Sequence, residues 1–306
     1  MITNPPRLFE HPNMALSSLS ISEPLIAMRL TEGTKSEALR FLAQRPIQNV
    51  VMIGMIRDNG IESEFNRGHF YGCRNPAGSL VGVALIGHAV FIDARRDEAL
   101  RQFAELAQQF PRTHMLMGET ELIGRFWNYY YAPNGQPGKR LGREVLFELN
   151  VPPPPFERVP GLRPAEISDL ERVLPVHASM ALAESGVDPL RVDEDGFRLR
   201  CLRRIAAGRT WVLVEQDKLI FKAEIVSETP EVIYLEGVHV HPQFRGQGHG
   251  SRCLAQLSRQ LLQRTRSITL LVNQEQRQAQ RFYQRLGFVS RGWYDTIFLQ
   301  NQTEIV

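Results

Sequence analysis

The sequence has few cysteines, no long apolar run and almost no excess of charge. Its three cysteines, Cys73, Cys201 and Cys253, form no CxxC pair, which excludes a zinc finger and argues against a disulfide scaffold. No stretch approaches the roughly 18 apolar residues of a membrane span. The net charge of +3, from 36 basic and 33 acidic residues, is too balanced for a dedicated nucleic-acid binder. We therefore expect a soluble, cytoplasmic protein with no membrane or nucleic-acid partner.

The length of the chain and a proline-rich run at its midpoint suggest two domains. The chain has 306 residues with an ordinary globular composition, 43% hydrophobic and 23% charged, and domains average roughly 150 residues. Four consecutive prolines follow Val151 at the midpoint and favour a stiff extended linker. The first 23 residues contain Pro5, Pro6 and Pro12 and no signal-peptide pattern. We predict a flexible extension at 1–23, a first domain at 24–150, a linker at 151–160 and a second domain at 161–306.

Both halves repeat one coarse order of elements: helix, helix or loop, three strands, helix, strand, helix, strand. This order predicts an α/β protein with a mixed sheet, built as a tandem of two similar units. In the first half we expect helices at 34–42, 97–110 and 119–129, and strands at 69–73, 80–86, 88–93, 115–117 and 144–150. In the second half we expect helices at 167–183 (broken by Pro175), 194–207, 251–264 and 276–286, and strands at 210–215, 219–226, 232–240, 268–273, 288–290 and 296–299.

The segment after the strand that ends at Val240 is the most informative. Pro242 stops the strand, and the run Arg245-Gly-Gln-Gly-His-Gly250 then leads directly into a helix. Alternate glycines let the backbone approach a ligand and point N–H groups at it, and a helix N-terminus adds partial positive charge, so the pattern predicts a pyrophosphate cradle. It is neither G-x-G-x-x-G nor a P-loop. A simple tight turn, the alternative, would need one glycine. Nine arginines and one acid between Arg245 and Arg291 add positive charge.

At this point the sequence resembles the GCN5-related N-acetyltransferase (GNAT) superfamily. Residues 245–250 match its R-x-x-G-x-G signature, 236–240 with Pro242 match its fourth strand, and 272–273 with 279–288 match its fifth strand and following helix. The resemblance covers about residues 160–300 and implies the acyl-CoA N-acyltransferase fold. His249 departs from it, since an aliphatic residue is more common there. Residues 184–189, 221–224 and 296–298 also resemble a two-domain bacterial type with a degenerate N-terminal GNAT-like domain.

The resemblance implies acetyl-CoA as cosubstrate and a role for each matching residue. Tyr283 would protonate the departing thiolate, and Glu236 would be the general base, through water. Asn273 would approach the pantetheine arm. Period-two geometry would place Glu236, Val238 and Val240 on one strand face. The cofactor-binding set is Val238, His239 and Val240 for pantetheine and the thioester carbonyl, Arg245, Gly246, Gln247, Gly248, His249, Gly250 and Ser251 for the pyrophosphate, and Asn273, Ala279 and Phe282.

The predicted reaction is acetyl transfer to a primary amine, of a small molecule or a peptide, by direct attack in a ternary complex. The chemistry needs a carboxylate to take the amine proton and a donor for the oxyanion. Plainer interpretations stay open: Glu236 could bind a cationic substrate, Tyr283 could be a core aromatic, and Cys253 is most simply core. The helix region at 183–188 would line the acceptor side.

Two other functions compete with this one. A non-catalytic CoA-binding regulatory module would keep the glycine loop without using Glu236 and Tyr283. A transferase of the tandem type that uses aminoacyl-tRNA is less favoured, because the near-neutral first half offers little positive charge to bind RNA phosphates. His239, His241 and His249 lack a further ligand pattern, so no metal is expected. The first half lacks the glycine-rich loop, so we expect it to form a wall of the acceptor cleft or a structural platform. The sequence is compatible with either a monomer or a homodimer.

Overall fold

The computed structural model describes residues 25–131 and 139–299. The extension expected at 1–23 lies outside the described residues. The first half forms η1 (Glu32–Thr34), α1 (Lys35–Leu42), α2 (Val50–Asn59), η2 (Glu64–Asn66), α3 (Asp97–Ala107) and α4 (Thr120–Tyr131), with strands β1 (Ala27–Arg29), β2 (Gly68–Arg74), β3 (Leu80–Gly87), β4 (Ala89–Ala94), β5 (Met115–Glu119) and β6 (Lys139–Leu149).

The second half repeats this order. Its helices are η3 (Ile167–Asp169), α5 (Leu170–Ser185), α6 (Pro189–Val192), α7 (Glu194–Ala206), η4 (Pro242–Phe244), α8 (His249–Leu261) and α9 (Arg277–Arg285), and its strands are β7 (Arg163–Pro164), β8 (Thr210–Glu215), β9 (Lys218–Glu228), β10 (Val232–Val240), β11 (Ser267–Asn273) and β12 (Val289–Leu299). The predicted mixed α/β fold is confirmed. Within the described ranges, no helix is long and apolar enough to cross a membrane.

Two local predictions were wrong. Pro175 does not break its helix but lies inside α5, because Val173, Leu174 and Ala178 are buried on both sides of it and their packing outweighs the one lost hydrogen bond. The two strands predicted at 288–290 and 296–299 are one strand, β12, which continues through a pairing irregularity between Ser290 and Gly292. The irregularity hides the strand in the sequence pattern because it interrupts the alternation.

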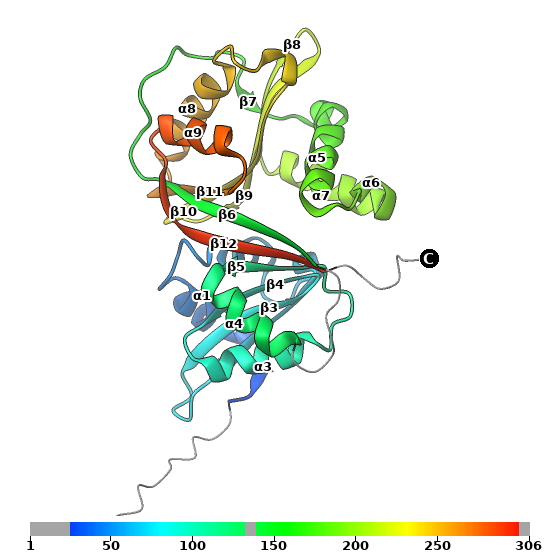
Figure 1. Ribbon diagram of the computed structural model, residues 1–306, viewed down its shortest axis with the longest axis vertical. Helices are drawn as coiled ribbons and strands as arrows, with labels where there is room; N and C mark the ends of the chain where they lie inside the picture. The colour runs from blue at the N-terminus through cyan, green and yellow to red at the C-terminus, as the bar shows by residue number, and fades with distance from the viewer. Residues whose placement is uncertain (1–24, 132–138, 300–306) are drawn as a thin grey trace, which may run out of the picture.

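The described residues form one twelve-stranded sheet in which the two halves exchange their last strands. The order is β1-β2-β3-β4-β5-β12-β6-β11-β10-β9-β8-β7. Strand β12, from the end of the second half, pairs with β5 of the first half, and β6, from the end of the first half, pairs with β11 of the second. Strands β6 and β12 lie side by side, antiparallel, at the middle of the sheet (Figure 1). The order is therefore symmetric about the β6/β12 pair.

Helices cover both faces of the sheet and the exchange extends into the core. In the second half α8 and α9 enclose one buried cluster, while α5 and α7 enclose another on the opposite face. Phe147 of β6 is 1% exposed in the cluster under α8 and α9, with its ring 6.3 Å from that of Tyr283. Truncating such a ring to alanine typically costs about 3–5 kcal/mol. Phe147, from the first half of the chain, thus contributes to the hydrophobic core of the second half.

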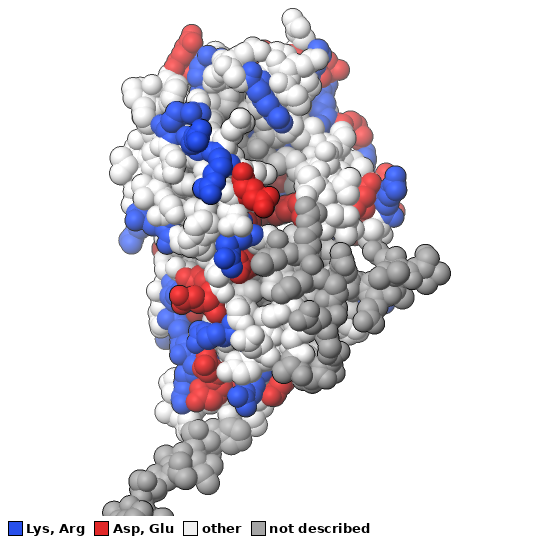
Figure 2. Space-filling view, in the orientation of Figure 1, with Lys and Arg blue, Asp and Glu red and all other residues white. Residues whose placement is uncertain are grey.

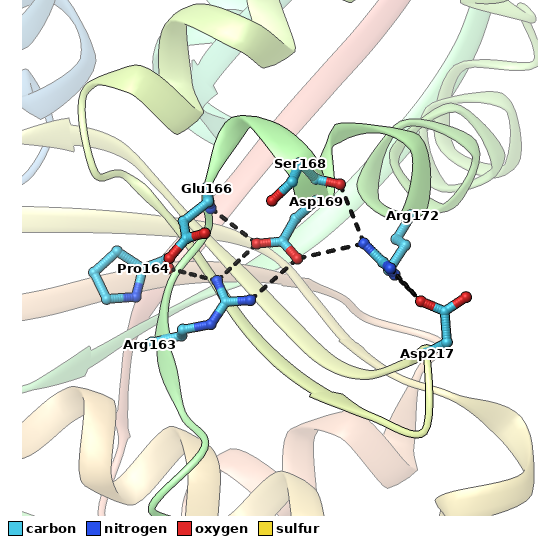
Figure 3. A network of polar contacts seen from close by, with 7 residues as sticks. All are labelled: Arg163, Pro164, Glu166, Ser168, Asp169, Arg172 and Asp217. Carbon is cyan, nitrogen blue, oxygen red and sulfur yellow. Dashed lines mark hydrogen bonds and ion pairs between the residues drawn. The ribbon is translucent and has the colours of Figure 1, made fainter.

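A buried carboxylate fixes the start of α5. Asp169 is 2% exposed and accepts two hydrogen bonds from Arg163, at 2.7 and 3.2 Å, and one from the backbone N–H of Glu166 at 2.8 Å (Figure 3). Arg172 joins Asp169 to Asp217 in the β8–β9 turn. Burial alone would raise the pKa of Asp169, but these contacts hold it below its ordinary value. The network ties α5 to the sheet on the side that faces α7.

Candidate functional site

The sheet opens between β10 and β11. In this parallel pair, only residues Val232–Tyr234 of β10 pair with Ser267–Thr269 of β11. Strand β10 nevertheless continues to Val240, and β11 continues to Asn273. Beyond that point β10 stays paired with β9, and β11 with β6. The two strand edges that face the opening therefore offer backbone N–H and C=O groups to a ligand. An extended ligand can add to them as a strand does.

A β-bulge redirects β10 at the opening. Its pairing with β9 shifts register between Glu236 and His239, and Gly237 has a φ of 61°. A Cβ at Gly237 would lie 2.7 Å from the Nζ of Lys222, so a side chain there would clash. The extra residue corrects the prediction that Glu236, Val238 and Val240 share one face. His239 follows Glu236 on that face, whereas Val238 and Val240 pack on the core under α8 and α9.

A buried ionic network supports this bulge. The fully buried Lys222 places its Nζ 3.4 Å from the carbonyl oxygen of Gly237 and 3.1 Å from the Glu224 carboxylate. Glu224 also accepts from Arg204 at 2.6 Å and contacts His177 at 2.9 Å. Burial alone would raise the pKa of Glu224, but the charges of Lys222 and Arg204 and the contact with His177 hold it well below its ordinary value. Glu224 is therefore an ionised structural group.

The glycine-rich loop has the geometry predicted from its sequence. Gly246 and Gly248 have φ values of 75° and 81°, a conformation that favours glycine. Gly248 is the N-cap of α8, no side chain caps the helix, and its first turn contains no acidic residue. Its first N–H groups have no partner within the helix and carry partial positive charge. A Cβ at Gly250 would lie 3.0 Å from Val240, so this turn packs directly on the end of β10.

The polar side chains of the loop bond within it. Arg245 donates from Nε to the carbonyl oxygen of Val240 at 3.0 Å, and Gln247 donates to the carbonyl oxygen of Gln243 at 2.9 Å. His249 is the first residue of α8 and meets the ring of Phe244 edge-on at 5.8 Å. The side chains of residues 245–249 thus brace the turn, and the backbone of this segment remains the part suited to an anion. Ser251 follows in the first turn of the helix.

Three more predicted residues line the other side of the opening. Ala279 and Phe282 on α9 pack against the core cluster that contains Val272, and a Cβ on Gly250 would lie 3.4 Å from the Phe282 ring. Asn273 ends β11, where its Oδ1 accepts from the N–H of Glu275 at 2.9 Å. The predicted loop, strand end and helix therefore come together around the splayed strands.

Tyr283 and Glu236 lie on opposite sides of the sheet. Tyr283 is 9% exposed, packs against Phe282 and Phe288 in the core under α9, and burial raises its pKa. Glu236 is exposed on the face covered by α5 and α7, close to the guanidinium of Arg204. Both groups belong to elements that border the place where β10 and β11 stop pairing. Burial, with the charges of Arg245 and Lys222, lowers the pKa of His239 to about 4, so this imidazole is neutral at pH 7.

Sequence reasoning missed a second carboxyl group of this site. Glu144 on β6 pairs with Asn273 of β11 and with Tyr294 of β12, and it accepts a hydrogen bond from the Thr296 hydroxyl at 2.9 Å. Burial, and then the negative charge of Glu236, raises the pKa of Glu144 to about 7. No clear signal marked it in the sequence, because the same strand also carries other charged residues such as Arg143 and Glu148.

Figure 2 shows acidic and basic side chains meeting at a hollow in this half of the molecule.

The cysteines and histidines do not suggest other chemistry. Cys73, Cys201 and Cys253 are buried and unbonded, and burial raises their pKa values to about 12, 11 and 12. Such thiols are poor nucleophiles at neutral pH. Among the residues with described positions, no group of three or more His, Cys, Asp or Glu side chains could hold a metal ion.

Comparisons with known proteins agree with this geometry. A family model described as the acetyltransferase (GNAT) family matches residues 180–288, and no curated protein matches the chain. A GNAT-family acetyltransferase from Colwellia psychrerythraea superposes with a TM-score of 0.56 at 13% identity, over 90% of this chain and 98% of that one. A Drosophila protein superposes with a TM-score of 0.64 at 12% identity, over 90% and 99%.

The tandem arrangement also has a counterpart. A tandem GNAT protein from the clavulanic acid biosynthesis pathway superposes with a TM-score of 0.55 at 14% identity, over 89% of this chain and 98% of that one. At these identities the structural likeness concerns the fold, and the family match concerns the second half. The splayed strands, the glycine loop before α8 and these matches together show the acyl-CoA N-acyltransferase fold, built as a tandem of two units, and residues 180–288 match the GNAT family model.

Proposed function

We propose that the protein is an N-acyltransferase that moves an acetyl group from acetyl-CoA to a primary amine. The observation that carries the proposal is the opening between β10 and β11, which ends at the glycine loop and the uncapped start of α8. An extended pantetheine arm suits the free strand edges, and a pyrophosphate suits the loop and helix N–H groups. The GNAT family match covers these elements.

The residues around the opening suit direct transfer in a ternary complex. The thioester of acetyl-CoA supplies the activated acyl group. A backbone N–H near Val240, at the end of β10, would donate to the oxyanion that forms on the acyl carbonyl. Tyr283, on the α9 side, would protonate the leaving thiolate, and a carboxylate on the α5 and α7 side would take the amine proton. The raised pKa values of the three thiols favour this route over an acyl-cysteine intermediate.

The first test is thiol release from acetyl-CoA across a panel of amines, together with calorimetric binding of acetyl-CoA. The panel contains amino acids, polyamines, peptides, aminoglycosides and arylamines. Turnover with one class supports the transferase and identifies the acceptor type. Binding without turnover, and equal behaviour of Tyr283→Phe, favours a CoA-binding regulatory module. Absence of acetyl-CoA binding contradicts the proposal as a whole.

A matched pair of variants tests the loop. Gly248 and Gly78 have almost the same φ, 81° and 82°, but Gly78 lies in the β2–β3 turn of the first half, where a Cβ would meet nothing within 4 Å. Both alanine variants bear similar backbone strain, about 1–2 kcal/mol. We expect Gly248→Ala to weaken acetyl-CoA binding by about tenfold or more, equivalent to about 1.4 kcal/mol, and Gly78→Ala to bind it as the wild type does. Equal affinities would mean that the loop does not hold the pyrophosphate.

A further inference from the structure

The exchanged strand β6 carries a carboxyl group into the opening of the other half. In antiparallel pairs, residues directly opposite each other point to the same face. Glu144 is opposite Asn273 on one side and Tyr294 on the other, so its side chain lies on the face that carries the acceptor end of the opening. Tyr234, opposite Thr269 in the last pair before the strands part, is on the same face. Glu144 thus stands beside the open end of the splay.

The groups around Glu144 are acidic or neutral. Tyr234 and Glu236 interact with it from β10, and Thr296 donates to it from β12. The charges of Glu144, Glu236 and Glu184 of α5 all act on Tyr234, and burial together with them raises the pKa of that phenol well above its ordinary value. The influences on Glu144 from described residues are burial, the Thr296 hydroxyl and Glu236, and none of them is a cation.

Glu144 therefore differs from the other two carboxylates of this region. Glu224 is surrounded by Lys222, Arg204 and His177 and stays ionised. Glu236 is exposed and lies near the guanidinium of Arg204. Glu144 is half-buried and lies near a second carboxylate, and desolvation with that charge raises its pKa to about 7. A general base acts best when its pKa is near the working pH, and paired carboxyl groups with different surroundings commonly divide their roles in this way.

We propose that Glu144, supplied by the first half of the chain, accepts the proton of the acceptor amine in the site of the second half, while Glu236 binds the positive charge of the incoming ammonium. The inference rests on the proposed N-acetyltransferase function. It assigns the first half a direct part in the reaction and indicates an acceptor that arrives as a cation.

The ammonium R–NH3⁺ gives one proton to the Glu144 carboxylate and becomes a neutral amine, and its lone pair forms the N–C bond with the acyl carbon. The tetrahedral adduct collapses with cleavage of the C–S bond. Tyr283 gives its proton to the thiolate and regains one from the amide nitrogen, and Glu144 releases its proton to solvent. The products are the amide, the free thiol and one proton.

The test compares pH profiles of kcat/KM for three conservative variants, using the best amine of the panel. Glu144→Gln keeps the volume and the hydrogen bond from Thr296. We expect it to lower kcat/KM about 100-fold, within the usual contribution of a general base. We also expect it to remove the increase of kcat/KM with pH near pH 7. Glu236→Gln should raise KM for the amine and move that rise to lower pH, because it removes the neighbouring negative charge. Glu148→Gln, on the same strand and paired with Arg291, is the matched control and should change neither.

Several outcomes would overturn the proposal. If Glu144→Gln keeps the rise near pH 7 and Glu236→Gln loses it, Glu236 is the base. If Glu144→Gln also loses acetyl-CoA binding or melts well below the wild type, its role is structural. A readout independent of turnover is difference infrared titration of the wild type against Glu144→Gln, which should show one carboxyl group titrating near pH 7. Absence of that carboxyl signal overturns the assignment, even if thiol release supports the transferase. A wild type that shows the signal but acetylates no amine overturns the proposed function and, with it, this role.

Discussion

Replacement of Glu224 by glutamine is the most direct test of how the bulge at the opening is held. The substitution keeps the shape of the side chain and removes its charge. Lys222 is 0% exposed and has the Glu224 carboxylate 3.1 Å away as its counter-charge. Breaking a buried ion pair on one side leaves an uncompensated charge and typically costs about 3–5 kcal/mol. Arg204 is about a third exposed, so water replaces most of what it loses. We therefore assign nearly all of this cost to Lys222.

The measurement is the free energy of unfolding from urea titration followed by circular dichroism. Whole-protein stabilities are about 5–15 kcal/mol, so a loss of this size is large and easily resolved. The companion variant Lys222→Met combined with Glu224→Gln removes both charges and should recover most of the loss. An unchanged unfolding midpoint in Glu224→Gln would refute the reasoning. So would a double variant that is no more stable than the single one, since that result would trace the loss to something other than the buried charge.

Gly237→Ala should lower the melting temperature and weaken acetyl-CoA binding, because its φ is 61° and its Cβ would clash; unchanged values would mean that the bulge is dispensable. Cys73 and Cys253 should react with a thiol reagent only after unfolding, since both are fully buried; rapid native labelling would contradict this. Asp169→Asn should cost about 1–2 kcal/mol at pH 7. Contacts such as that from Arg163 lower the pKa of Asp169, so they stabilise the fold above the unfolded pKa of about 3.9. The difference from wild type should shrink as the pH falls below that value and be lost as the pH passes the lower pKa of the folded state.

The order of elements and the loop could be predicted because their signals are local. Alternating glycines at 246, 248 and 250, a strand stopped by Pro242 and a helix directly afterwards are all contained in one short segment. The structure places the strand, the loop and α8 where these signals indicated. Apolar spacing likewise identified most strands and helices of both halves, with errors mainly of a few residues at their ends, but the short strands β1 and β7 were not predicted.

The parts that could not be predicted depend on distant partners. The exchange of β6 and β12 pairs residues about 150 positions apart, such as Glu144 with Tyr294, and each strand has the same alternation whichever sheet it joins. The bulge at Gly237 reverses the facing of every later residue in β10, and one glycine does not reveal it. Glu144 became part of the site through the strand exchange, because its neighbours Asn273 and Glu236 belong to strands of the other half.

The exchange of strands also bears on how the chain is made. Strand β5 ends at Glu119, but its neighbour β12 is complete only at Leu299, 180 residues later. At about 5–20 residues per second of synthesis, the first half must wait roughly 9–36 seconds with the edge of β5 unpaired. An exposed edge strand is a site for aggregation, so a nascent chain of this protein should depend on chaperones until its last strand leaves the ribosome. A premature stop close to the C-terminus would then harm the part of the protein that was synthesised first.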